Sequence, residues 1–296
     1  MIVVKICGGL GNQMFQYAMA RSVATRHNTE VKLDLSWFAD TGTTTGRIFD
    51  LQRLNITINE ATHDEVSRLL KLRKQLGRDL YGILIPFRWK KYLKMKEFRP
   101  FDERYLNVSS DVYLEGYWTD ERYFADVSSL VKKEFTLRGT LSTKNQQIAE
   151  NIRKTLNSIS IHVRRGDYVQ DETTRAIFHL CNEDYYARAV AEVKKRIKDP
   201  VFFVFSDDIE WVKKHIAIGA ETRYVSDYGE GLPHEEMMLM SMCRHNIIAN
   251  STFSWWAAWL NPNRDKVVIA PDRWYNLEEY SGAECVPAGW IKIPVS

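Results

Sequence analysis

The sequence contains little that would support a disulfide-stabilised or membrane-spanning protein. Its four cysteines, Cys7, Cys181, Cys243 and Cys285, lie far apart among 296 residues and form no CxxC pair. Widely spaced cysteines in apolar or helical surroundings are typical of reduced, buried thiols in a reducing compartment. No window holds 18 uninterrupted apolar residues, and the first apolar run is too short for a signal peptide. We therefore expect a soluble, cytoplasmic protein.

The chain also lacks a strong excess of charge of either sign. Its 41 basic and 38 acidic side chains leave a net charge of +3, which does not predict nucleic acid as a partner. Basic residues nevertheless gather in residues 72–96, where they are mixed with Leu, Ile, Phe and Trp. This mixture predicts either an exposed basic helical pair or a surface that touches an anionic membrane. The second alternative implies a peripheral position on the cytoplasmic face of the inner membrane.

Short apolar runs alternate with helical patterns along most of the chain. Strands are predicted at residues 2–6, 30–35, 111–118, 158–163, 201–205, 222–226, 246–250 and 266–270. Strands that alternate with helices predict an α/β fold with parallel, doubly wound sheets. Turn residues followed by a helical pattern within residues 137–157 place a domain division near residue 150. The predicted domains are therefore residues 1–150 and 151–296.

In such sheets, ligands bind in the loops that follow the carboxyl ends of the strands. The first of these loops, GGLGNQ, contains Gly8, Gly9 and Gly11 between a predicted strand and a predicted helix. Its backbone amides could approach a phosphate, but the G-x-G-x-x-G template fails because Met14 stands at the third glycine position. A tight turn without a ligand remains an alternative. The amides of Asn12 and Gln13 favour a loop that binds sugar hydroxyls.

The loop after residues 158–163 carries an unusual concentration of charge, in the sequence HVRRGDY. Arg164 or Arg165 offers a planar fork of N–H donors that matches phosphate oxygens. Asp167 could orient an arginine or accept a hydroxyl proton, and His162 shares a strand face with Arg164. A structural Arg–Asp ion pair at the end of a strand is the alternative.

Two further loops carry polar residues at the same predicted edge. Asp207 and Asp208 follow the apolar run 201–205, where they could bind a metal or ribose, or cap the next helix. The scattered histidines give a metal site no support. Ser251 and Thr252 are good helix-capping residues, and the start of the helix that follows could form a second anion-binding site. The tryptophans that follow, at 255, 256 and 259, fit a core or a ligand platform. Together these loops suit a diphosphate.

Four motifs resemble the α-1,2-fucosyltransferases of glycosyltransferase family 11. They are GGLGNQMFQYA at 8–18, VYLEGYW at 112–118, HVRRGDY at 162–168 and HNIIANSTFSWWAAWL at 245–260. The resemblance implies a GT-B-type fold of two Rossmann-like domains facing a cleft, with residues 151–296 binding the donor and residues 1–150 mainly the acceptor. It implies inverting transfer of L-fucose from GDP-β-L-fucose to the 2-hydroxyl of a terminal galactose. No metal or other cofactor is expected.

The resemblance also implies roles for individual residues. Arg164 would hold the donor β-phosphate, His162 would line the nucleotide pocket, and Arg165 with Asp167 would brace the loop. Glu236 would read the guanine, with Glu235 as the second candidate. The remaining donor-binding residues that it implies are Asp208, Asn250, Ser251, Thr252, Phe253 and Ser254, with Gly11, Asn12 and Gln13 near the transferred sugar. A bacterial enzyme of surface polysaccharide or O-antigen synthesis is the expectation, because no N-terminal anchor is evident.

The general base is left open between three carboxylates, Asp167, Glu172 and Asp208. Glu172 stands at a spacing from Asp167 that resembles the base of a related core fucosyltransferase. Other readings of the whole chain are a fucosyltransferase of another linkage, a galactoside-binding lectin without catalysis, and a nicotinamide oxidoreductase. Met14 argues against the oxidoreductase, and the arginine pair argues against the lectin.

Overall fold

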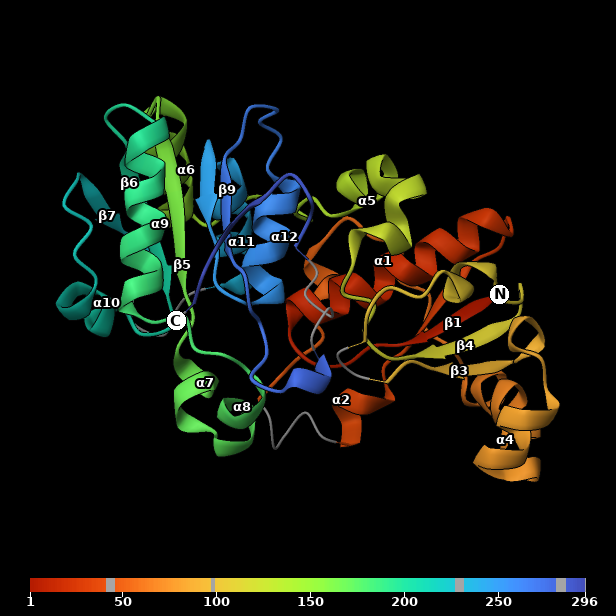
Figure 1. Cartoon of the computed structure of the whole chain (residues 1–296). Helices are drawn as coiled ribbons and strands as arrows, with labels where there is room; N and C mark the ends of the chain where they lie inside the picture. The colour runs from red at the N-terminus through yellow and green to blue at the C-terminus, as the bar shows by residue number, and fades with distance from the viewer. Residues whose placement is uncertain (41–45, 97–98, 227–231, 281–285, 296) are drawn as a thin grey trace. The chain divides into compact units, whose positions relative to one another are not determined.

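The chain folds into two compact units, each built on a parallel β-sheet (Figure 1). The computed structural model describes residues 1–40, 46–96, 99–226, 232–280 and 286–295. The first unit is Met1–Arg138 and the second is Gly139–Ser296. The predicted α/β class, with two doubly wound units, is confirmed.

The boundary between the units lies earlier than the predicted division at residue 150. Helix α6 (Thr143–Lys154) belongs to the second unit because it contacts α11 (Pro233–Met242). The carboxylate of Glu235 on α11 accepts hydrogen bonds from the backbone N–H of Ser142 at 3.0 Å and from the Asn145 amide at 2.6 Å. These contacts fix the start of α6 to the second unit.

The first unit contains a four-stranded sheet in the order β2-β1-β4-β3. Its strands are β1 (Ile2–Lys5), β2 (Val31–Asp34), β3 (Tyr92–Lys94) and β4 (Val112–Glu115), and neighbouring strands are parallel. The helical segments are α1 (Leu10–Arg26), α2 (Ser36–Asp40), η1 (Leu51–Arg53), α4 (His63–Leu84), η2 (Phe87–Trp89), η3 (Glu103–Asn107), η4 (Glu121–Val127) and α5 (Ser128–Glu134). The chain passes from β1 to β2 on one side and places β4 on the other. The glycine-rich loop after β1 therefore lies at the point where the strand order reverses.

The second unit contains a six-stranded parallel sheet in the order β10-β9-β8-β5-β6-β7. Its strands are β5 (Ser158–Val163), β6 (Val201–Ser206), β7 (Thr222–Tyr224), β8 (His245–Ile247), β9 (Val268–Pro271) and β10 (Ile291–Ile293). The other helices are α7 (Gly166–Gln170), α8 (Glu172–Ile177), α9 (Glu183–Arg196), α10 (Ile209–His215), α12 (Thr252–Leu260) and η5 (Glu278–Tyr280). Here the strand order reverses between β5 and β8.

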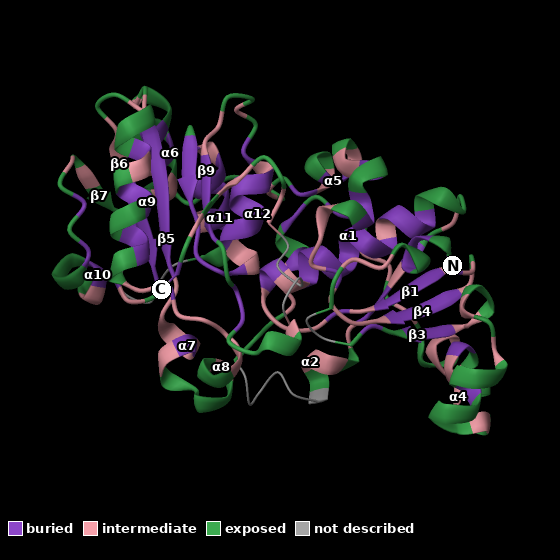
Figure 2. Ribbon diagram, viewed as in Figure 1, coloured by how far each residue is buried: buried purple, intermediate pink, exposed green. Residues whose placement is uncertain are grey.

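Strand β5 is buried along its whole length, as Figure 2 shows for the centre of this sheet. Its alternate side chains face opposite sides. Ile159, Ile161 and Val163 join the apolar core formed with α9 and α10. On the other face, the Ser160 hydroxyl accepts a hydrogen bond from Asn246 at 2.7 Å, and His162 lies against Phe253 of α12. The sheet thus directs His162 towards the face that α12 covers.

Most predicted strands and helices are confirmed, and β3 and β10 were missed. Of the two alternatives for the tryptophans, the core is right, because Trp255, Trp256 and Trp259 are all buried in the second unit. Cys181 and Cys243 are buried free thiols, whereas Cys285 lies outside the described residues. No helix within the described ranges is long and apolar enough to cross a bilayer.

Candidate active site

The functional candidates of the second unit gather where its strand order reverses. The loops that follow β5 and β8 meet there, because these two strands are parallel neighbours. The Tyr168 hydroxyl of the first loop donates to the carbonyl of Asn250 in the second at 3.0 Å. The crevice at such a reversal is the usual ligand position in open α/β sheets.

Arg164 is the central cation of this edge, and two carboxylates hold it. Its Nη2 lies 2.7 Å from Asp167 and its Nη1 lies 2.7 Å from Asp207. The side chain is 22% exposed, so the guanidinium is largely buried but still reachable. Burial lowers the pKa of Arg164, and the neighbouring Asp207 and Asp167 more than offset this, so the net shift is upwards. A pre-oriented, permanently charged fork suits a phosphate group.

Asp207 also determines the backbone of the loop, a role that the sequence did not assign to it. Its Oδ1 accepts the backbone N–H of Arg165 at 2.8 Å. A Cβ atom built on Gly166 would lie 2.7 Å from Asp207 Oδ2, closer than side chains tolerate. The signal for this role was the position of Asp207 directly after β6, the parallel neighbour of β5. Glycine at 166 therefore lets the loop approach the carboxylate.

Arg165 faces a different environment from Arg164. Its guanidinium stacks over the Trp211 ring at 3.6 Å from the ring centroid, and its Nε lies 3.3 Å from Asp208. Asp208 is also the N-cap of α10, where its side chain accepts the backbone N–H of Trp211. The helix-cap alternative for Asp208 is therefore right. Arg165 braces the loop against α10 and contributes less directly to an anion site than Arg164.

His162 presents a buried polar atom without a partner. Its Nδ1 is inaccessible to solvent and has no hydrogen-bond partner among the residues that the structure describes. The ring lies 5.5 Å from that of Phe253 at the start of α12. Burial, with a smaller contribution from Arg164, lowers the pKa of His162 to about 3. The imidazole is therefore neutral, and a buried ring nitrogen without a partner is an exception that needs an explanation.

Helix α12 begins beside this histidine. Ser251 is its N-cap and accepts the backbone N–H of Phe253, while the Ser254 hydroxyl donates back to the carbonyls of Ala249 and Ser251. The start of a helix carries partial positive charge and favours an anion. Thr252 and Phe253 occupy the first turn.

The side chain of Asn250 has a structural role at this edge of the sheet. Its side-chain amide donates to the carbonyls of His179 and Trp274 at 2.5 and 2.9 Å, and its oxygen lies 3.5 Å from the Cys181 thiol. The side chain is buried. These contacts tie together three loops at the carboxyl edge, and the donor contact predicted for Asn250 stays a prediction.

The structure separates the two glutamates proposed to read a base. The carboxylate of Glu235 already accepts hydrogen bonds from residues at the start of α6, as described above. Burial raises the pKa of Glu236, a hydrogen bond from Ser226 lowers it and the charge of Asp207 raises it, so the net shift of this pKa is upwards. Glu236 is thus the carboxylate of α11 that shares an electrostatic environment with the Arg164 cluster.

The three base candidates have unlike surroundings. Asp167 is tied to Arg164, and Asp208 caps α10. The Glu172 side chain is 91% exposed in the first turn of α8, 3.9 Å from Arg175. Asp167 is therefore the candidate that the structure places directly at the Arg164 cluster.

The glycine-rich loop of the first unit holds one predicted residue in an unexpected way. Gln13 is fully buried, and its amide donates to the carbonyls of Gly8 and Ile48, both at 2.8 Å. Its oxygen accepts the backbone N–H groups of Asp50 and Leu51. All of its bonding capacity serves the loop, so the prediction that Gln13 faces a sugar is wrong.

Gly8 and Asn12 keep the turn before α1 tight. Gly8 has φ +75°, and a Cβ there would lie 3.0 Å from the Asn12 side-chain nitrogen. Asn12 is half-buried, and Gly11 is buried in the first turn of α1. Among the described residues, no group of three or more His, Cys, Asp and Glu side chains could hold a metal ion.

The second unit therefore places a largely buried arginine, a neutral histidine and the start of a helix at the edge where its strand order reverses, an arrangement that suits an anionic ligand. The chain belongs to glycosyl transferase family 11, whose family model matches residues 1–294. It is therefore a family 11 glycosyltransferase, and the family resemblance of its four motifs is confirmed.

The chain is similar to glycosyltransferases with different donors. An α-1,2-colitosyltransferase of Escherichia coli is 35% identical over 99% of this chain and 98% of its own length. The O-antigen biosynthesis glycosyltransferase WbnK of Escherichia coli is 30% identical over 91% and 93%. The galactoside 2-α-L-fucosyltransferase Sec1 of Mus musculus is 24% identical over 91% and 67%.

A solved structure shares the fold. The crystal structure of the α-1,6-fucosyltransferase NodZ soaked with GDP-fucose matches with a TM-score of 0.51 at 15% identity, covering 92% of this chain and 94% of that one. At this identity the likeness concerns the fold, and the predicted GT-B-type fold is confirmed.

Proposed function

We propose that this protein transfers L-fucose from GDP-β-L-fucose to the 2-hydroxyl of a terminal galactose, with inversion, in the synthesis of a surface polysaccharide such as an O-antigen. The α-1,2 linkage is supported by the similarity to the α-1,2-colitosyltransferase, and the polysaccharide role by the similarity to the O-antigen biosynthesis glycosyltransferase WbnK. The observation that carries the proposal is the Arg164 guanidinium, held by two carboxylates at the carboxyl edge of the sheet.

The donor diphosphate would occupy the space between Arg164 and the start of α12. Its β-phosphate would bind the guanidinium of Arg164, and the oxygens of the diphosphate would face the backbone amides near Ser251. His162 Nδ1 would find a polar partner in the donor, which explains why a buried nitrogen can lack one in the protein. Glu236 would accept the N1 and N2 protons of guanine, which adenine cannot supply in this pattern.

In the reaction the bond between the fucose anomeric carbon and the β-phosphate oxygen breaks as the acceptor oxygen attacks from the opposite face. Negative charge accumulates on the departing GDP, and Arg164 stabilises it without a metal ion. Loss of one pre-oriented group of this kind typically slows a reaction by about 10²–10³-fold. The acceptor is bound mainly by the first unit.

The proton of the acceptor hydroxyl must leave as the new bond forms. Asp167 is one candidate acceptor for this proton, and its ion pair with Arg164 would have to open for it to act as the base. Glu172 and Asp208 are the alternatives, and their positions on α8 and at the α10 cap give each a distinct test. A residue that serves as the base would, when changed to its amide, lower turnover and leave GDP binding intact.

Transfer of colitose is a second candidate, favoured by the 35% identical relative. Colitose is L-fucose without the 3-hydroxyl, so both donors present the same diphosphate and guanine to the residues of the second unit. A site that hydrogen-bonds the 3-hydroxyl would reject colitose strongly, whereas an apolar contact there would discriminate little against either sugar.

A competition experiment separates the two donors. The protein would be incubated with equal amounts of GDP-fucose and GDP-colitose and a β-galactoside acceptor, and the products identified by mass and by NMR. Fucosylated α-1,2 product in excess supports the proposal, and colitosylated product in excess replaces it with the second candidate. A fucosyl product of another linkage would overturn the linkage assignment.

A further inference from the structure

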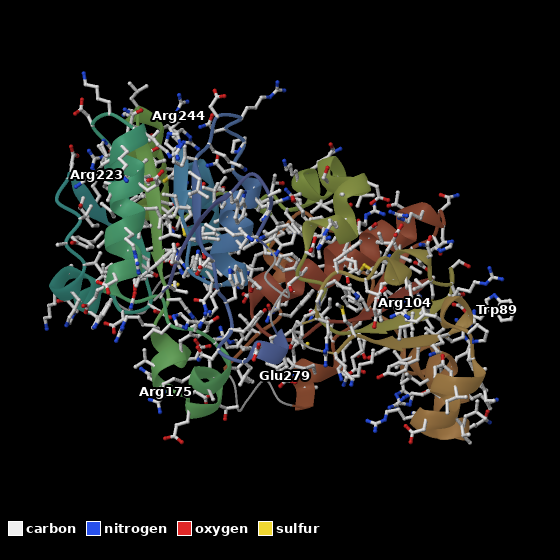
Figure 3. All side chains as sticks on the ribbon, in the orientation of Figure 1. Trp89, Arg104, Arg175, Arg223, Arg244 and Glu279 are labelled. Carbon is white, nitrogen blue, oxygen red and sulfur yellow. The ribbon has the colours of Figure 1, made fainter. Side chains whose placement is uncertain are left out.

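A cluster of large apolar side chains lies exposed on the first unit, at the end of α4 and in η2. Leu80, Ile83, Leu84 and Trp89 are 53%, 79%, 59% and 61% exposed. Figure 2 shows α4 as largely exposed, and Figure 3 shows Trp89 at the outer edge of this unit. Single exposed apolar residues are ordinary, but four within ten positions form a patch that normally has a partner.

The fold holds these side chains outwards. Gly77, with φ 74° and ψ 168°, breaks the helical path of α4 and redirects its last part. Tyr81 in that part is buried, and its hydroxyl accepts the backbone N–H of Tyr92 at 3.0 Å. With Tyr81 anchored to the sheet, Leu80 and Leu84 share a face with Ile83 at helical spacing and point away from the core. The exposure is therefore built into the local structure.

Basic side chains surround this patch. Residues 71–96 contain nine Lys and Arg and a single acidic residue, Asp79. The one carboxylate lies 3.6 Å from Arg78, and both side chains are more than four-fifths exposed. Arg88 stacks over the Trp89 ring at 5.1 Å, and Lys90 donates to the carbonyl of Gly82 at 3.2 Å. The positive charge is thus fixed beside the apolar cluster.

We propose that this surface, made of Leu80, Ile83, Leu84 and Trp89 with Arg78, Arg88 and Lys90, docks the protein on an anionic lipid bilayer. Apolar side chains can enter the boundary between headgroups and acyl chains, while the neighbouring cations meet lipid phosphates. A nucleic acid would interact with the basic side chains but would leave the aliphatic side chains exposed to water. The proposal goes beyond the transfer reaction and does not depend on it.

Vesicle flotation without donor or acceptor tests the proposal. Wild type should float with vesicles of phosphatidylcholine and phosphatidylglycerol and remain unbound with phosphatidylcholine alone. Each Lys or Arg near an anionic surface contributes roughly a fivefold factor in binding, so Arg78, Arg88 and Lys90 changed together to Gln should lose about a hundredfold. Leu80, Ile83 and Leu84 changed together to Ser should lose more than about tenfold.

Matched controls lie on the second unit. Lys195, Lys213 and Arg223 changed together to Gln remove the same charge from another surface, and Leu156→Ser removes a leucine that is more exposed than Leu80 and Leu84. These variants should float like wild type. Quenching of tryptophan emission by brominated lipid should fall in Trp89→Phe, which places Trp89 in the bilayer.

Three results would overturn the proposal. One is equal flotation of wild type with neutral and anionic vesicles, and another is equal loss in the control variants. The third is absence of flotation combined with concentration-dependent self-association that the Ser variant abolishes, because the surface would then cover a second copy of the chain.

Discussion

The carboxylate of Asp207 and the guanidinium of Arg164 lie 2.7 Å apart across the carboxyl ends of two neighbouring parallel strands, β6 and β5. Asp167, three residues after Arg164, forms an ion pair with the other terminal nitrogen, Nη2, of the same guanidinium. One side chain is thus fixed from two directions before any donor arrives. Such pre-orientation lowers the reorganisation that accompanies charge development in a reaction.

Asp207→Asn should lower turnover by about tenfold, because Arg164 keeps its ion pair with Asp167 but loses the ion pair with residue 207 that also orients it. Donor affinity should change less than kcat, since the charge of Arg164 remains. Steady-state kinetics with GDP binding by calorimetry would separate the two effects. Asp102→Asn is the matched control, because Asp102 forms an equally short pair with Arg104 on the first unit. A loss confined to GDP binding would contradict the positioning role.

Gly166→Ala should reduce activity by about tenfold or more, because the new methyl group would displace the Asp207 carboxylate that lies 2.7 Å from its position. The same change in an Asp207→Ala background should cost little more than Asp207→Ala alone. A double-mutant cycle on kcat measures this coupling. Additive losses would show that the two positions act independently.

His162 should make the folded protein sensitive to acid. It stays neutral in the folded state down to pH about 3, whereas the unfolded chain takes up the proton near the ordinary pKa of 6.5. The unfolded state therefore binds more protons between these values, and the free energy of unfolding falls as pH is lowered through this window. The contribution of this group is about 2 kcal/mol between pH 7 and pH 5.

Urea unfolding of wild type and His162→Leu at pH 7 and pH 5 would check the effect. The wild type should lose about 2 kcal/mol more than the variant over this range. Equal losses in the two proteins would mean that His162 is accessible to protons in the folded state. GDP binding by the variant, measured at pH 7, reports separately on the unpaired Nδ1.

Glu236→Gln should weaken the preference for guanine. A carboxylate that accepts from both N1 and N2 gives GDP an advantage over IDP, which lacks the exocyclic amine, of about tenfold or more. The variant should bind GDP and IDP with nearly equal, lower affinity. Calorimetry with both nucleotides measures the ratio.

Glu235→Gln is the control for this change, because Glu235 holds the start of α6. It should lower the free energy of unfolding and keep the GDP-to-IDP ratio of the wild type. If Glu235→Gln altered the ratio and Glu236→Gln did not, the assignment of the two glutamates would be reversed.

Local patterns in the sequence predicted the parts of the fold that depend on neighbouring residues. Strands β5 and β6 are uninterrupted buried runs, and the cap at Asp208 needs only the helix that follows it. Strands β3 and β10 were missed because each has only three residues, and β10 has no buried residue among them. Motif similarity likewise identified the family and the arginine loop.

Roles that depend on distant partners could not be predicted. The amide of Gln13 meets the backbone of Ile48 and Asp50, and that of Asn250 meets His179 and Trp274. In the sequence, each amide stands within a ligand-like motif, and nothing nearby indicates the buried partners. The importance of Asp207 follows only from the register of β5 and β6. The domain boundary was misplaced for the same reason, because Glu235 fixes α6 from ninety residues away.

The most direct test of the account is the product formed from GDP-fucose and a β-galactoside in excess EDTA, by wild type and by Arg164→Ala. The account predicts an α-1,2-fucosylated product, identified by NMR, that persists in EDTA and falls by about 10²–10³-fold in the variant. Undiminished product from Arg164→Ala would contradict the placement of the donor phosphate, and loss of product in EDTA would contradict the metal-independent mechanism.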